Sequence, residues 1–342
     1  MQRESTRRGF SVNHQKVALE IDFSGSLQGF TEITIVPNIP DLRTVHLHAR
    51  HCKISSIKID GHTAGFLHHD PLSNLTVSKP DEFNVYPELK RRLYSALSES
   101  DEGELSIAIP SQVPITLVHP AAAATATTVN ANANANPNPN AAGSGVVGTL
   151  GSGQHQHSKE YTPIVIRIEY SLKDPEEGIQ FVIPSQNYPY RVPHVYTTPS
   201  SPDAARCWIP CVDNLWERCT WEFEFVVPRS LDVDGESSTG PNYNVVVVCS
   251  GEFQQQIVHP LDPTKVIFLF EQQALTSVQH ITFVAGPFYV MPMSSNPAPT
   301  NTLHHSRIVD QNLVDVAAVA AGQPRMHAFC LPGHERHLLA TA

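Results

Sequence analysis

The sequence predicts a mainly β fold, and three observations support that prediction. Short segments alternate apolar and polar residues with a period of two, which is typical of half-buried strands. Glycines and prolines separate these segments, and the chain of 342 residues holds 28 prolines. Charged residues make up only 16 % of the chain, against about 25 % in typical globular domains. Many short strands and loops, together with low-complexity inserts, account for all three observations.

The first part of the chain predicts a sheet that starts near residue 12. In the segment 17–23, Val17, Leu19, Ile21 and Phe23 fall on one face. Pro37 ends the second predicted strand because proline lacks the backbone donor that a ladder needs. The strands predicted here cover residues 17–23, 30–36, 44–48 and 54–61.

One amphipathic helix is predicted over residues 87–98, where Leu89, Leu93, Tyr94 and Leu97 recur at helical spacing. The strand pattern then resumes, over residues 104–110, 164–170, 179–184, 221–228, 244–249, 265–270 and 280–288. In the segment 221–228 we expect Trp221, Phe223 and Phe225 to share the buried face.

Two low-complexity stretches interrupt the pattern. Residues 119–160 are rich in Ala, Asn and Gly and hold no apolar set large enough to offset the entropy of ordering, so we predict a disordered insert. Residues 292–325 are predicted to be a low-complexity linker, in which 308–321 has helical character. One β-domain would then comprise residues 12–118 and 161–291, after a flexible N-terminus at 1–11.

The last residues, 326–342, predict a strand that enters a helix. We interpret this segment as the start of a following α-containing domain, and the chain as the front part of a larger protein.

Composition excludes several classes of protein. The formal net charge of −10 is unfavourable for bulk attraction to nucleic acid, although a local basic patch remains compatible with it. No run approaches the roughly 18 apolar residues of a membrane span, and the N-terminus lacks the apolar segment of a secretory signal. Six cysteines are too sparse for a disulfide scaffold, which favours an intracellular protein with reduced thiols.

Three groups of residues invite a catalytic or metal-site interpretation. His334, Glu335 and His337 form H-E-R-H, but the zinc motif H-E-x-x-H needs its histidines four residues apart. Cys207, Cys211 and Cys219 lack the second cysteine pair of a structural zinc site, so we expect buried small side chains.

His46 and His48 would share one strand face as two ligands, but no third ligand is evident, so we expect a partly exposed strand face. The sequence therefore predicts no catalytic set, no metal site and no cofactor.

Three segments resemble the N-terminal β-domain of the M1-family zinc aminopeptidases. The first sixty residues are similar to the opening of that domain. The segment R-C-W-I-P-C-V-D-N-L-W-E-R-C-T-W-E-F-E-F-V-V-P (206–228) matches its Pro-Cys-hydrophobic-Asp turn at Pro210, Cys211 and Asp213. The segment H-I-T-F-V-A-G-P-F (280–288) is similar to the strand that closes the domain. The resemblance implies saddle-like or sandwich-like antiparallel sheets.

The departures from the peptidase pattern point to a non-enzymatic branch. The Gln-containing segment that holds the substrate amino terminus in the peptidases is replaced here by V-Y-T-T-P-S-S-P-D-A-A. The closing H-A-F-C-L-P is also closest to the TATA-binding-protein-associated factors, which are subunits of the general transcription factor TFIID. We call the residues that carry this likeness the signature residues: Trp208, Pro210, Cys211, Asp213, Trp221, Gly286, Pro287 and Phe288.

That branch implies a nuclear protein that recognises core promoter DNA around the initiator and contacts other TFIID subunits. It implies no catalysis, no small-molecule substrate and no membrane partner. The residues that contact DNA are unknown, and local candidates are Lys53, Lys58, Arg91, Arg92, Arg3, Arg7 and Arg8. Two alternatives remain open, namely the N-terminal domain of an active M1 zinc aminopeptidase and a free-standing β-sandwich binding module.

Overall fold

The structure is a computed structural model that describes residues 8–70, 86–100, 103–118, 161–198, 203–232, 242–293 and 326–341. The predicted insert at 119–160 lies outside the described residues, as do residues 294–325 of the predicted linker and residues 1–7 of the predicted flexible N-terminus. The helical character predicted for 308–321 therefore also lies outside them.

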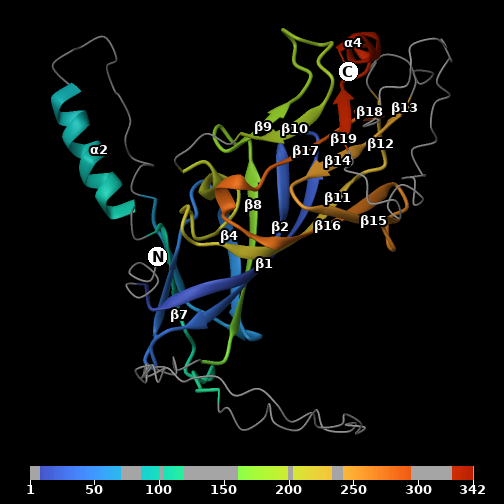
Figure 1. Ribbon diagram of the computed structural model, residues 1–342. Helices are drawn as coiled ribbons and strands as arrows, with labels where there is room; N and C mark the ends of the chain where they lie inside the picture. Colours follow the sequence, from blue (N-terminus) through green and yellow to red (C-terminus); the bar gives the residue numbers. More distant parts are fainter. Residues whose placement is uncertain are drawn as a thin grey trace, which may run out of the picture.

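A mainly β fold is observed, as the sequence predicts (Figure 1). The largest sheet has eight strands in the order β15-β16-β11-β1-β2-β8-β4-β5. In chain order these strands are β1 (Phe10–Asp22), β2 (Ser26–Pro37), β4 (Lys53–Ile59), β5 (His62–Thr63), β8 (Ile164–Lys173), β11 (Cys219–Pro228), β15 (Glu252–Val258) and β16 (Lys265–Thr276).

Neighbouring strands in this sheet are antiparallel except for one pair. β1 and β11 run parallel, with His14 opposite Thr220 and Leu19 opposite Phe225. The predicted antiparallel sheets are therefore observed, with this one parallel pair as an addition. Parallel pairing needs a long crossover rather than a tight turn, and some two hundred residues of chain separate the two strands.

Four smaller sheets complete the β structure. A four-stranded sheet has the order β14-β17-β10-β9, a three-stranded sheet has the order β3-β7-β6, and β12-β13 and β18-β19 form two-stranded ribbons. Their bounds are β3 (Thr44–Leu47), β6 (Phe66–His68), β7 (Leu105–Ala108), β9 (Ile179–Val182), β10 (His194–Thr197), β12 (Ser230–Asp232), β13 (Asn242–Asn244), β14 (Val246–Cys249), β17 (Phe283–Gly286), β18 (Tyr289–Met293) and β19 (Met326–Cys330).

Helices are few. α2 (Tyr86–Ser100) covers the predicted helix and stands beside the sheets, whereas α4 (Glu335–Thr341) follows β19 at the opposite end of the molecule (Figure 1). Two short 3-10 helices, η3 (Ala205–Cys207) and η4 (Val278–His280), flank strands of the core. The predicted strand 280–288 is shortened accordingly, because residue 280 belongs to η4. None of the helices among the described residues is long and apolar enough to cross a membrane.

The core lies between the eight-stranded and four-stranded sheets. On β11 the rings of Trp221, Phe223 and Phe225 stack at centroid distances of 5.9 and 6.0 Å, and all three side chains are buried. The Phe225 ring lies 4.7 Å from that of Phe283 on β17, so the two sheets meet through aromatic side chains. The predicted buried face of residues 221–228 is thus confirmed.

Candidate functional site: a buried ionic cluster at the Pro-Cys turn

Residues 203–218 form the turn that precedes β11, and we call this segment the Pro-Cys turn. Backbone hydrogen bonds join it to the chain that follows β3. The amide of Arg50 donates to the Arg206 carbonyl at 2.7 Å, and His48 and Cys211 exchange two backbone bonds at 2.8 and 2.9 Å. From the large sheet, Nε2 of buried Gln15 donates to the Pro210 carbonyl at 3.0 Å. The turn is therefore fixed to two sheets at once.

A group of five charged residues surrounds this turn, and we call it the ionic cluster: Arg50, Glu104, Asp203, Arg206 and Asp213. Arg206 pairs through Nε with Asp213 Oδ2 at 3.0 Å and through Nη1 with Glu104 Oε1 at 3.2 Å. Arg50 Nη2 reaches the same Glu104 oxygen at 3.2 Å. The side chains of Glu104 and Asp213 have no exposed area and the two arginines only 6 %, so these pairs are removed from solvent.

Further bonds orient the side chains of the cluster. The second oxygen of Glu104 accepts the Ala49 amide at 3.1 Å. The partly exposed Asp203 accepts Arg206 Nη2 at 2.9 Å and lies 3.8 Å from Arg50 Nη2. Two guanidinium groups thus face three carboxylates. Although burial alone would lower the pKa of Arg206, Glu104 and Asp213 outweigh it and raise that pKa.

His48 connects the cluster to the backbone of the turn. The amide of Asp213 donates to His48 Nδ1 at 3.0 Å, so the imidazole accepts here and is neutral. Burial, and then the nearby Arg206 charge, lower the pKa of His48 to about 4. The other Asp213 oxygen accepts Nε2 of Gln279 from η4 at 3.1 Å. Asp213 is therefore bonded to three residues, because its carboxylate pairs with Arg206 and Gln279 and its backbone amide donates to His48.

The three cysteines of the C-x3-C-x7-C pattern are buried free thiols. Burial raises the pKa of Cys207 and of Cys219 to about 12, and that of Cys211 well above its usual range. A thiol must ionise to act as a nucleophile. The three thiols are therefore protonated at neutral pH in this structure and, as the sequence predicts, they are buried small side chains.

The eight signature residues do not gather in one site. Trp208, Pro210, Cys211 and Asp213 lie in the Pro-Cys turn, where the Trp208 ring packs edge-on against Phe283 at 5.5 Å. Trp221 lies on β11 and donates from Nε1 to the Thr276 carbonyl at 2.9 Å.

The other three signature residues, Gly286, Pro287 and Phe288, follow one another at the end of β17, and all three are buried. A Cβ on Gly286 would lie 2.7 Å from the Cβ of His194 on the neighbouring strand β10, which leaves little room for a side chain. The ring of Phe288 packs edge-on against Phe329 of β19 at 5.5 Å. These three residues therefore join the four-stranded sheet to the β18-β19 ribbon.

The histidines that the sequence patterns group together have different surroundings in the structure. His46 Nδ1 is 3.0 Å from the Ser106 hydroxyl, whereas His48 turns to Asp213, so the two do not form a shared pair of ligands. The expectation of a partly exposed face is wrong for His48, which is buried. His334 and His337 are exposed at the start of α4, with ring centroids 6.0 Å apart.

The basic candidates for DNA contact also differ in their surroundings. Arg8 is paired with Glu217 at 3.0 Å in a partly buried position. Arg91 pairs with Glu88 at 2.6 Å on the exposed face of α2. Lys53 and Lys58 are exposed on β4. Arg3 and Arg7 lie outside the described residues.

These features define a mainly β domain in which a buried ionic cluster and backbone hydrogen bonds fix the Pro-Cys turn in place. No family model matches the chain. Its sequence is similar to proteins named transcription initiation factor TFIID subunit 2. It is 27 % identical over 315 residues to that of Schizosaccharomyces pombe, covering 80 % of this chain and 23 % of the relative. It is 30 % identical over 244 residues to that of Saccharomyces cerevisiae, covering 67 % and 16 %.

The relative from Drosophila melanogaster has the same name and is 28 % identical over 299 residues, covering 83 % of this chain and 20 % of the relative. The chain therefore spans about a fifth of the length of the curated relatives it matches. Its resemblance to a TFIID subunit, inferred above from the sequence, is confirmed at the level of sequence similarity.

Solved structures with a similar fold include yeast LTA4 hydrolase bound to bestatin. The TM-score is 0.48 at 14 % identity, over 83 % of this chain and 30 % of that one. The M1 zinc metallopeptidase of Deinococcus radiodurans gives a TM-score of 0.46 at 13 % identity, over 84 % and 44 % of the two chains.

Proposed function

We propose that this chain is part of a TFIID subunit 2 and acts there as a non-catalytic scaffold in the nucleus, contributing to core promoter recognition and to assembly with other TFIID subunits. The observation that carries the proposal is the sequence similarity to proteins of that name, which extends over 80 % of this chain for the Schizosaccharomyces pombe relative. The similarity is spread over the β-domain rather than restricted to one short motif.

The ionic cluster supports a scaffold role. A catalytic group has to touch the substrate, whereas Glu104, Arg206 and Asp213 are buried and bonded to one another. The cluster joins the Pro-Cys turn to the segment that follows β3, through Arg50, and to the segment that precedes β7, through Glu104. A fold can be retained for its architecture while its surface takes on a different role.

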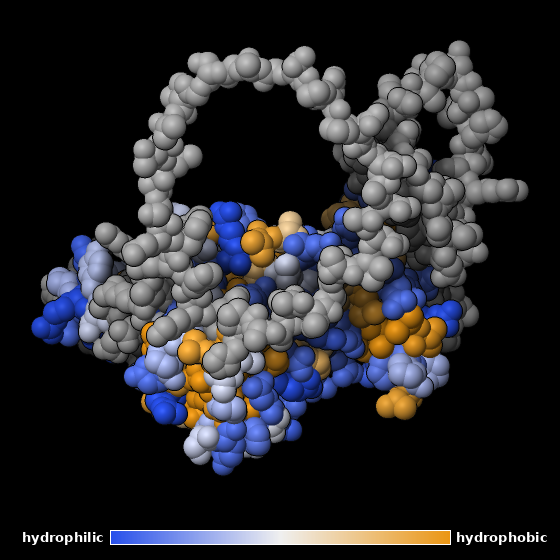
Figure 2. Space-filling model, turned by 60° about the horizontal axis from the view of Figure 1, so that its bottom comes forward, coloured by the Kyte–Doolittle hydropathy of each residue, from blue (hydrophilic) through white to orange (hydrophobic). Residues whose placement is uncertain are grey.

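Contacts with other subunits would use exposed apolar side chains. One face of the molecule carries separate apolar patches within a largely hydrophilic surface (Figure 2). Near the edge strand β15, Val258 is 55 % exposed and Leu261 is 89 % exposed. Exposed apolar groups of this kind mark surfaces at which proteins associate.

Promoter contact would be local, because the net charge of −10 opposes bulk attraction to DNA. Lys53 and Lys58 are the two exposed basic candidates on β4. We expect the double variant Lys53→Ala/Lys58→Ala in the assembled complex to weaken initiator binding. The matched control is Lys16→Ala, because Lys16 already lies within 3.9 Å of Glu222 and 3.7 Å of Glu224. If the double variant bound the promoter as tightly as the control variant, β4 would not be part of the DNA interface.

The proposal that this chain is part of a TFIID subunit can be tested by tagging the full-length protein in its source cells. The proteins that co-purify with it from nuclear extract are then identified. We expect the TATA-binding protein and other TFIID subunits in near-stoichiometric amounts. Recovery of the protein alone, or from the cytoplasm only, would contradict the proposal.

The alternative is the N-terminal domain of an active M1 zinc aminopeptidase, and it makes a different prediction. The full-length protein would then release amino-terminal residues from peptides in a chelator-sensitive reaction. Sequencing the transcript past the codon for Ala342 adds an independent criterion. An H-E-x-x-H motif with a distal glutamate would favour the peptidase, whereas a continuation without these ligands would favour the scaffold.

A further inference from the structure

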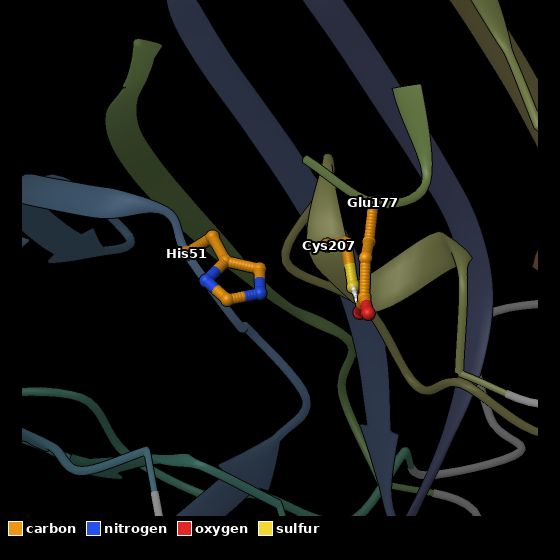
Figure 3. Close-up of side chains that lie close together, drawn as sticks. All are labelled: His51, Glu177 and Cys207. Carbon is orange, nitrogen blue, oxygen red and sulfur yellow. Dashed lines mark hydrogen bonds between the residues drawn. The ribbon is translucent and has the colours of Figure 1, made fainter. Parts of the chain in front are cut away.

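We propose that His51, Glu177 and Cys207 bind a divalent transition-metal ion, for which zinc is the best match. The three side chains face one another beside the Pro-Cys turn (Figure 3). They come from three separate segments, namely the connection between β3 and β4, the connection between β8 and β9, and η3. The cysteine spacing groups Cys207 with Cys211 and Cys219, and no sequence pattern links it to His51 or Glu177.

The ligand chemistry selects the class of metal. An imidazole nitrogen, a thiolate sulfur and a carboxylate oxygen are three donor types that Zn²⁺ takes in proteins, and binding of the metal would release the proton of the Cys207 thiol to solvent. The sulfur disfavours Mg²⁺ and Ca²⁺, which prefer oxygen ligands. Three protein ligands leave a fourth tetrahedral position for water or for an external ligand.

The geometry is close to what a tetrahedral ion requires. The three donor atoms all lie within 4.8 Å of one another, and Cys207 Sγ is 3.9 Å from Glu177 Oε2. Zinc bond lengths place neighbouring ligand atoms roughly 3.3–3.8 Å apart. His51 and Glu177 are exposed, whereas Cys207 is buried. The buried thiol is therefore fixed in position, and the two exposed side chains are the ones that can adjust to an ion.

The backbone brings the ligands together. Gly178 has a φ of 76°, in the left-handed region, and a Cβ there would lie 2.2 Å from the Ala204 carbonyl oxygen. Only glycine permits this approach, and it carries the adjacent Glu177 against η3. His51 itself has a φ of 60°, and the Cys52 amide donates to the Arg50 carbonyl across it at 2.7 Å.

The neighbouring charges favour a cation. In the ionic cluster two arginines face three carboxylates, which leaves a net negative charge before Glu177 is included. The backbone carbonyl of Asp203 accepts the Cys207 thiol at 3.3 Å, so the ionic cluster adjoins the three donors. A divalent cation would neutralise the excess together with Glu177.

The test is metal binding by the full chain, purified, stripped with chelator and then titrated with Zn²⁺ or Co²⁺. We expect one equivalent of zinc per chain after dialysis, and with cobalt a thiolate-to-metal charge-transfer band in the near ultraviolet. Cys207→Ser should abolish the band. The matched control is Cys330→Ser, because Cys330 is a half-exposed thiol on β19, away from η3. The control should bind as the parent does.

Two further variants keep the test decisive if Cys207→Ser misfolds. Glu177→Gln changes an exposed side chain, and His51→Asn keeps a residue that tolerates positive φ. Each should weaken zinc binding by at least about tenfold. Absence of the charge-transfer band in the parent, or unchanged affinity in both variants, would show that the three groups form only a local hydrogen-bonded cluster and would overturn the proposal.

Discussion

The aromatic core on β11 and the ionic cluster of the Pro-Cys turn are both buried, yet they stabilise the molecule in different ways. Trp221, Phe223 and Phe225 contribute through the apolar area that they remove from water, and that contribution depends little on which apolar neighbour they contact. Glu104 and Arg206 contribute only while each keeps its partner, because a buried unpaired charge is far more costly than an exposed one. Apolar packing degrades gradually, whereas an ionic cluster fails when one member is lost.

The two regions also differ in how they assemble. The aromatic face comes from alternate residues of one strand. The ionic cluster needs residues near positions 50, 104 and 206, together with Gln279 from η4. The ionic cluster therefore forms only when distant segments of the chain reach their native positions. The aromatic face does not require this, because it comes from a single strand.

Removing Glu104 should have the largest effect. Glu104→Ala leaves two buried guanidinium groups without their shared carboxylate and the Ala49 amide without its acceptor. We expect the free energy of unfolding to fall by about 5 kcal/mol. Chemical denaturation measures this. Glu104→Gln, which keeps size but not charge, should lose less, and equal stability of Glu104→Ala and the parent would contradict the assignment.

Truncating the aromatic core should cost slightly less. Trp221→Ala removes a buried indole that stacks on Phe223 and bonds to the Thr276 carbonyl, so we expect a loss of about 4 kcal/mol. Thermal and denaturant unfolding report it. The control is Phe253→Ala on the edge strand β15, where the ring is 38 % exposed and the loss should be clearly smaller. If both variants lost a similar free energy of unfolding, burial of the side chain on β11 would not explain the loss at Trp221.

Lowering the pH should reduce the stability that the ionic cluster contributes, but not the stability that the aromatic core contributes. Because the pKa of His48 is lowered from 6.5 to about 4, the unfolded chain binds a proton there in this range and the folded chain does not. The stability contributed by neutral His48 is therefore complete above pH 6.5 and is lost as the pH falls toward 4. The loss is on the order of 3 kcal/mol.

His48→Asn isolates this contribution, because an amide oxygen can accept the Asp213 amide without titrating in this range. The free energy of unfolding, measured by denaturant at several pH values, should depend less steeply on pH in the variant than in the parent. Parallel pH profiles would show that His48 does not control the acid sensitivity of the cluster.

The aromatic region was predictable from the sequence because a period of two places Trp221, Phe223 and Phe225 on one face whatever surrounds them. The strand β15 was not predictable in that way. All seven residues of its sequence, E-F-Q-Q-Q-I-V, are exposed, so no second layer demands that apolar and polar residues alternate. The parallel pairing of β1 with β11 was missed for a related reason, since local pattern does not encode the partner of a strand.

The candidate site was harder to anticipate. Asp213 and Cys211 were singled out through their resemblance to a known turn, but Glu104 and Arg50 carry no local signal of burial. Charged residues are exposed by default, and only the tertiary meeting of Arg50, Arg206 and Glu104 makes their burial favourable. The same holds for His51 and Glu177, which are far from Cys207 in the sequence.

Loss of an ion pair at the surface should have the smallest effect on the free energy of unfolding. Glu32 pairs with Arg167 at 2.8 Å, but both side chains are about one-third exposed and solvent screens their attraction. Arg167 also lies over the Phe30 ring, 3.4 Å from its centroid, so it keeps a neighbour when the carboxylate is removed. We expect Glu32→Ala to lower the free energy of unfolding by about 0.2–1 kcal/mol, and less at high salt. A loss as large as that of Glu104→Ala would mean that burial is not what distinguishes the ionic cluster from an ordinary ion pair.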